Sequence, residues 1–115
     1  MNNPLILCFL MFFIVFAGCQ EYGVQVRVQN ASNTQFDRIS INNVSFGPLA
    51  AKETSSYMPF ENIYEKEFIE VIVDGKPIKL IPEDFKADQY YDSGNYKFTV
   101  DLFQKKWLLV SFQEE

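Results

Sequence analysis

Histidine is absent from this chain, and cysteine and glycine are scarce. Without histidine, the sequence excludes the usual Ser–His and Cys–His nucleophile pairs and every histidine-ligated metal centre. The five glycines are spaced so that they form no phosphate-binding loop. Both cysteines, Cys8 and Cys19, lie at the start of the chain, so the rest must fold without a disulfide. We therefore expect a protein that is not an enzyme and holds no cofactor or metal.

Charge is also absent from the part of the chain that ends at Cys19. Residues 5–18 are apolar, which suits an export signal but is shorter than the about 20 apolar residues that span a bilayer as a helix. The sequence Phe16-Ala17-Gly18-Cys19 resembles the lipobox of bacterial lipoproteins. This resemblance implies cleavage between Gly18 and Cys19, and a diacylglycerol on the thiol of Cys19.

The lipobox divides the chain into three parts. We expect a lipoprotein signal peptide at residues 1–18, a lipidated tether at 19–23 and a folded domain at 24–115. Two or three acyl chains anchor a protein to a membrane in an effectively permanent way. The expected location is therefore the cell envelope, at the outer membrane, with the domain facing the periplasm or the cell surface.

The net charge of −5 comes from 15 acidic and 10 basic residues, all of which follow Cys19. An acidic domain repels phosphate backbones, so nucleic acid is excluded as a partner, whereas a basic protein is electrostatically favoured. Aromatic residues make up 17% of the chain, and aromatic residues favour strands over helices.

The period of the apolar residues is two along most of the chain, which indicates half-buried β-strands. Asp74-Gly75 predicts a type I′ hairpin, and Pro59 and Pro77 predict edge strands. We expect a bend at residues 44–49, one helical turn within residues 82–89, and brief pairing at Tyr90-Tyr91. The predicted strands are residues 24–29, 36–42, 53–60, 68–73, 76–81, 95–103 and 107–112.

About seven short strands with regular turn signals predict an all-β fold, a small antiparallel β-sandwich. Asp92-x-Gly94-x-Tyr96-x-Phe98 resembles the start of strand F in immunoglobulin domains. The resemblance implies that the Tyr96 hydroxyl bonds to the backbone a few residues upstream. Phe98 stands where these domains have a disulfide cysteine, so we expect it to be buried, with Val26, Ile39, Ile41 and Val71 among its neighbours.

The chain as a whole resembles small lipoproteins of Bacteroidota-type bacteria that have immunoglobulin-like or transthyretin-like β-sandwiches. The resemblance implies a fold and a location but no reaction. The shared features, besides the lipobox, are Val26-Arg27-Val28-Gln29-Asn30, Phe46-Gly47-x-Leu49, Ser56-Tyr57, Val73-Asp74-Gly75 and Gly94-x-Tyr96-x-Phe98.

Two groups of residues are candidates for contact with a partner. Tyrosines give rigid, amphipathic contact area and could form a stacking platform for sugar or peptide, or could simply cap the core at the ends of the sandwich. The second group is acidic, and it lacks the residue order of a calcium loop, which favours a solvated loop over a metal site. The candidates are Tyr57, Tyr64, Tyr90 and Tyr91, with Asp84, Asp88 and Asp92.

These observations favour a lipid-anchored binding or assembly module of the cell envelope that presents loops or an edge strand to another envelope protein. An alternative is an acidic inhibitor or immunity lipoprotein that blocks a basic hydrolase or toxin through residues 82–92. An enzyme is the third hypothesis. It would need a pocket that holds two carboxylates with pKa values driven apart.

Overall fold

The computed structural model of the protein describes residues 23–82 and 90–115. The predicted signal peptide, Cys19, Asp84 and Asp88 lie outside the described residues, as does most of the segment expected to hold a helical turn. The described residues form ten strands and no helix. The strands are β1 (Val24–Asn30), β2 (Arg38–Ile41), β3 (Val44–Ser45), β4 (Met58–Phe60), β5 (Ile63–Tyr64), β6 (Ile69–Val73), β7 (Lys76–Leu80), β8 (Tyr90–Tyr91), β9 (Gly94–Phe103) and β10 (Trp107–Glu114).

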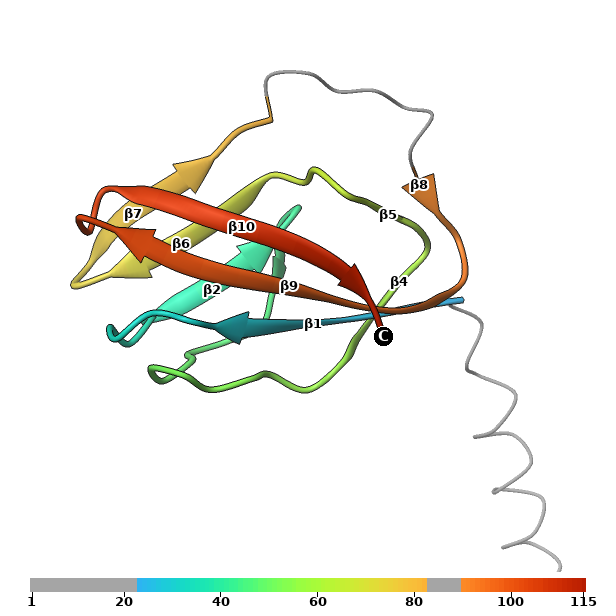
Figure 1. Ribbon diagram of the computed structural model, residues 1–115, viewed down its shortest axis with the longest axis horizontal. Coiled ribbons are helices and arrows are strands. Elements are labelled where there is room, and N and C mark those ends of the chain that lie inside the picture. Colours follow the sequence, from blue (N-terminus) through green and yellow to red (C-terminus); the bar gives the residue numbers. More distant parts are fainter. Residues whose placement is uncertain (1–22, 83–89) are drawn as a thin grey trace, which may run out of the picture.

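Two four-stranded sheets form the body of the molecule (Figure 1). One sheet has the strand order β10-β9-β1-β4, and the other has the order β3-β2-β6-β7. A separate two-stranded ladder joins β5 and β8. The buried side chains of both sheets belong to one core, so the all-β, sandwich-like architecture that the sequence predicts is confirmed.

The prediction of a purely antiparallel fold is wrong at one pair of strands. β1 pairs with β9 in parallel, from Val24 opposite Gly94 to Asn30 opposite Val100. Parallel neighbours need a long crossover connection. Here the crossover is the whole second sheet together with β4, β5 and β8, which the chain builds between β1 and β9. Strand periodicity marks which residues face the core, but it does not give the direction of a strand.

The core consists of the inward-facing residues of the alternating strands. Phe98 is fully buried, as predicted, and its ring meets Phe112 edge-on at 5.0 Å between centroids. Its four predicted neighbours are all buried in the same cluster. The complete buried apolar set is Val24, Val26, Val28, Phe36, Ile39, Ile41, Leu49, Phe60, Ile63, Ile69, Val71, Val73, Tyr96, Phe98, Val100 and Leu108.

Two tight hairpins connect strands of the second sheet. Asp74 and Gly75 have φ angles of 51° and 76° between β6 and β7, which confirms the predicted type I′ turn. Asn42 and Asn43 have φ angles of 48° and 67° between β2 and β3. Its second strand, β3, occupies the start of the segment, residues 44–49, where we predicted only a bend. Asparagine tolerates the left-handed conformation that such a turn requires, so the pair Asn-Asn was a usable signal.

The strand predicted at residues 53–60 is shorter than expected and is reduced to β4. In its first half, a serine hydroxyl takes the place of a backbone carbonyl as the acceptor for β1. The backbone N–H of Val28 donates to Ser55 Oγ at 2.9 Å, and Ser55 N–H donates to the Val28 carbonyl at 2.8 Å. Regular pairing with β1 begins only at Met58. β4 and β7 are both edge strands of their sheets, as their prolines predict.

The hydroxyl of Tyr96 donates to the carbonyl of Ser93 at 2.6 Å. This is the contact implied by the resemblance to strand F. Gly94 has a φ of 106°, and a Cβ there would lie 3.0 Å from the Tyr96 hydroxyl. The turn therefore needs glycine for its conformation and for the space that the tyrosine fills.

Asn30 is a fully buried polar residue at the end of β1. Its Nδ2 donates to the carbonyls of Thr34, Leu49 and Ala50, and its Oδ1 accepts from the backbone N–H and the hydroxyl of Ser32. A buried amide is tolerated when its donors and acceptors have partners. Asn30 thus ties the two loops that follow β1 and β3 to the end of the first sheet.

We predict that Phe98→Ala lowers the free energy of unfolding by about 3–5 kcal/mol, because it leaves a cavity in a core without disulfides. Lys97→Ala should change it by about 0.5 kcal/mol or less, because Lys97 lies half-buried on the outer face of β9. Denaturant unfolding of the two variants measures the contrast. Equal losses would contradict the alternation of faces along β9.

Candidate functional site

The four predicted tyrosines do not form a single platform. Three of them, Tyr64, Tyr90 and Tyr91, belong to the β5–β8 ladder, and Tyr57 lies elsewhere. Tyr64 and Tyr90 face each other across the β5–β8 ladder, with ring centroids 5.8 Å apart. Tyr91 packs inward on Tyr96, at 5.1 Å between ring centroids. Tyr57 lies in the β3–β4 connection, beside Arg27 of β1.

Tyr91 is a core-capping residue, which agrees with the second of the two interpretations left open by the sequence. Its ring also stacks on Phe112, and its hydroxyl donates to Glu65 Oε1 at 2.7 Å. The hydrogen bond to this carboxylate raises the pKa of Tyr91. Of the three candidate aspartates, the structure describes Asp92, which is exposed in the turn between β8 and β9.

Arg27, Tyr57 and Glu115 form a polar cluster on the outer face of the first sheet. The Arg27 Nε and Nη2 atoms each donate to one carboxylate oxygen of Glu115, both at 2.6 Å. The Tyr57 hydroxyl donates to Glu115 Oε1 at 2.8 Å, and the guanidinium lies 4.9 Å from the centre of the Tyr57 ring. The bidentate contact with Arg27 lowers the pKa of Glu115 from 4.5 to about 2. The cluster joins β1, the β3–β4 connection and the residue after β10.

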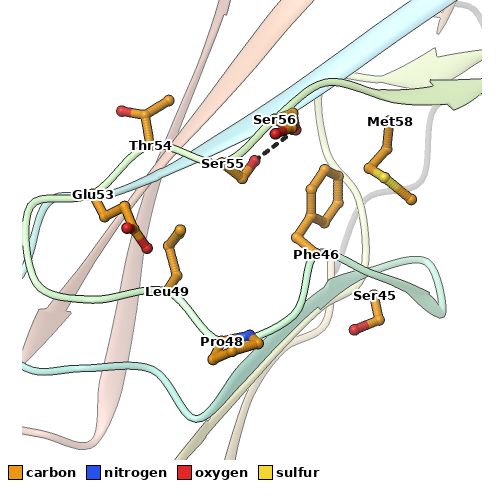
Figure 2. A pocket seen from close by; sticks show the side chains of 9 residues that line it. All are labelled: Ser45, Phe46, Pro48, Leu49, Glu53, Thr54, Ser55, Ser56 and Met58. Carbon is orange, nitrogen blue, oxygen red and sulfur yellow. Dashed lines mark hydrogen bonds between the residues drawn. The ribbon is translucent and has the colours of Figure 1, made fainter.

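A pocket of about 310 Å³ lies between the β2–β3 hairpin and the connection that leads to β4 (Figure 2). Apolar and hydroxyl-bearing side chains both line it. Figure 2 shows Phe46 and Met58 toward one end and Leu49 and Glu53 toward the other. The full lining is Ser45, Phe46, Pro48, Leu49, Glu53, Thr54, Ser55, Ser56 and Met58.

The polar groups of this pocket bind the protein's own backbone. Ser55 Oγ accepts from Val28 N–H and donates to the Ser56 carbonyl at 2.9 Å. Glu53 Oε1 accepts from Ala50 N–H at 3.1 Å, and Ser45 Oγ accepts from Gly47 N–H at 3.1 Å. A serine whose hydroxyl bonds only to backbone groups has no base to take its proton, so Ser55 is a structural link and not a nucleophile.

A second hollow, of about 450 Å³, lies between the edge strands β7 and β10. Its walls include Leu80 and Val110, and its rim includes two carboxylates, Glu65 and Glu67. Glu67 is 5% exposed and accepts from the backbone N–H of Tyr64 at 3.0 Å, and burial raises the pKa of its carboxyl group. The Glu67 side chain therefore closes the turn before β6 at the cost of desolvating a carboxylate.

Three large apolar side chains are more than half exposed near the β9–β10 hairpin. Phe103 is 52% exposed, Trp107 56% and Leu109 55%. Trp107 and Leu109 share the outer face of β10, because Leu108, Val110 and Phe112 face the core. The sequence analysis did not select these residues, although the same alternation that turns Leu108 inward places Trp107 outward. Lys106 Nζ lies 5.6 Å from the centre of the Trp107 ring.

Within residues 23–82 and 90–115, no group of three histidine, cysteine, aspartate or glutamate side chains is arranged to hold a metal ion. The same residues contain no helix long and apolar enough to cross a membrane. Comparisons with known protein families, curated proteins and solved structures found no match to this chain.

We predict that Glu115→Gln reduces the acid sensitivity of the fold. The pKa of Glu115 is lower in the folded protein than its ordinary value of 4.5, so its stabilising contribution is complete above pH 4.5. The contribution is lost as the pH falls from 4.5 to about 2, when the carboxylate takes up a proton that breaks the contact with Arg27. Melting temperatures of both proteins across this range test the prediction.

Glu67 titrates in both proteins, so the difference between them isolates Glu115. The wild type should lose more stability than Glu115→Gln between pH 4.5 and 2. Parallel pH profiles would show that the Arg27–Glu115 contact contributes nothing to the fold.

Proposed function

We propose that this protein is a lipid-anchored, non-catalytic binding module of a bacterial cell envelope. The observation that carries the proposal is the separation of two features along the first sheet. Residue 23, which follows the proposed anchor, lies at one end, and the exposed aromatic hairpin lies at the other. A domain with this layout holds its exposed apolar surface away from the membrane.

The parallel pairing of β1 and β9 sets this layout. Val24 lies opposite Gly94, and β9 runs from there to Phe103. At 3.3 Å per residue, nine residues of strand carry the chain about 30 Å. The hairpin that contains Phe103 and Trp107 is therefore at the far end of the sheet from residue 23 (Figure 1).

We also propose that the sandwich is of the transthyretin-like type. The sequence resembles two types, and the sheets of the immunoglobulin fold are antiparallel. The parallel β1–β9 pair departs from that arrangement. The tyrosine contact from Tyr96 to Ser93 agrees with the immunoglobulin resemblance over only a few residues, whereas the sheet order involves the whole domain.

The exposed residues of β10 favour a protein as the partner. Tryptophan is among the residues that most often dominate binding energy at protein interfaces. β10 is also an edge strand, so its outer edge can accept a strand from another chain. Unlike the edge strands β4 and β7, it contains no proline. Edge strands without proline or mid-strand charge are open to pairing.

We predict that Cys19→Ser leaves an unprocessed precursor that carries no lipid, because a serine hydroxyl cannot form the thioether. Growth with a labelled fatty acid should mark the wild-type protein and not the variant. Equal labelling of the two proteins would refute the lipid anchor.

We predict that Trp107→Ser and Leu109→Ser weaken partner binding at least tenfold, because each removes a large exposed apolar side chain from the outer face of β10. Cross-linking in intact membranes, followed by quantification of the cross-linked envelope protein, measures the effect. Both positions are exposed, so the fold should keep its melting temperature within a few degrees.

Ile81→Ser is the matched control, because Ile81 is 66% exposed but lies outside β10. It should leave the cross-linked yield unchanged. If the β10 variants retain full yield while the control loses it, the binding surface lies elsewhere and this part of the proposal fails.

A further inference from the structure

The β5–β8 ladder lies at the same end of the protein as the start of β1. Val24 is aligned with Phe60, the last residue of β4, and with Gly94, the first residue of β9. β5 begins three residues after Phe60, and β8 ends three residues before Gly94. Figure 1 accordingly shows β8 and the start of β1 at one end of the molecule.

The backbone at Gly23 is held firmly against this end. The N–H of Gly94 donates to the Gly23 carbonyl at 3.0 Å. A Cβ at residue 23 would lie 2.4 Å from the carbonyl oxygen of Asp92, which leaves room for glycine alone. Gly23 is the fourth residue after Cys19, and an extended chain over those four steps spans at most about 14 Å. A lipid on Cys19 would therefore keep this end close to the bilayer.

Two tyrosine rings lie at the same end, one exposed (Tyr90) and one half-buried (Tyr64). Tyr90 is 51% exposed, and its ring lies 5.8 Å from that of Tyr64 across the ladder. Tyrosine combines an apolar ring with a polar hydroxyl, and it is enriched where proteins meet the interface between lipid and water. Neither Tyr64 nor Tyr90 belongs to the main hydrophobic core, which includes Tyr96 and has Tyr91 packed against it.

We infer that Tyr64 and Tyr90 seat this end of the protein in the headgroup layer of the membrane that holds Cys19. The inference rests on the proposed lipid anchor. Nearby charges limit the kind of surface that fits, because the exposed carboxylates Glu61, Glu65 and Asp92 outnumber the exposed Lys66. A strongly anionic surface would repel this end, so the surface is a zwitterionic lipid layer.

A tryptophan reporter and the native Trp107 test the inference from opposite ends of the molecule. The full-length lipidated protein is reconstituted into zwitterionic phosphatidylcholine vesicles, with or without bromine atoms on the upper part of the acyl chains. One sample is the wild type, whose single tryptophan is Trp107. The other is the double variant Tyr90→Trp with Trp107→Phe, whose single tryptophan is at position 90.

Position 90 should show blue-shifted emission and strong quenching by the brominated lipid, because bromine quenches only at short range. Trp107 should show neither effect, since it lies about 30 Å farther along the sheet. Unshifted and unquenched emission from position 90 overturns the inference, and so does quenching of Trp107 equal to that of position 90.

Co-flotation with the vesicles, together with fatty-acid labelling, separates this result from the proposed anchor. Wild type and reporter should float and carry the fatty-acid label, and Cys19→Ser should carry no label, because a serine hydroxyl cannot form the thioether. Flotation without quenching at position 90 overturns only the seating of the tyrosines. A wild type that carries no more fatty-acid label than Cys19→Ser overturns the lipid anchor, and with it the inference that rests on it.

Discussion

The parallel register of β1 with β9 is the constraint on which the layout of this protein depends. It places Val24 beside Gly94 and so gathers the start of the domain, the β8–β9 turn and the end of β4 at one end. Because β9 is the longest described strand, its hairpin with β10 is carried to the opposite end. With β1 antiparallel to β9, residue 23 and the exposed hairpin would share one end, and the same residues would support a different mode of binding.

The described residues contain no cysteine, so no disulfide holds these strands in register. Packing between aromatic rings helps to hold them instead. Tyr91, Tyr96, Phe98 and Phe112 form a continuous set of ring contacts with centroids 5.0–5.6 Å apart. These rings come from β8, β9 and β10, so they hold the last three strands together. At the far end of β1, the hydrogen bonds of Asn30 tie the loops that follow β1 and β3 to the first sheet.

Much of the fold could be predicted from the sequence, because local signals determine it. Alternating valines mark β1, Asp74-Gly75 marks a hairpin, and Pro59 and Pro77 mark edges. The parallel pair escaped prediction, since a strand has the same alternation in either direction. The shortened β4 escaped because Ser55 Oγ takes the place of a backbone acceptor, which no pattern of apolar residues reveals.

The candidate surfaces were harder to predict than the fold, for a related physical reason. Tyr57, Tyr64, Tyr90 and Tyr91 have similar chemistry in the sequence, and only tertiary contacts separate the core-capping Tyr91 from the displayed Tyr90.

The sequence pattern predicts that Trp107 lies in a strand. Because Trp107 and Leu108 are adjacent in that strand, their side chains point to opposite faces, and the burial of Leu108 places Trp107 on the surface. For a small sandwich, the informative question is therefore which large apolar residues occupy outward positions. Burial of such residues in the core does not explain them, because water contacts Trp107 and Leu109 in the monomer. The proposed binding role would account for their exposure. The tyrosines of the β5–β8 ladder lie near the residue 23 end of the first sheet, and the hairpin near Trp107 lies at the opposite end. With the proposed lipid anchor near residue 23, the tyrosines would face the membrane and the hairpin would face the proposed partner.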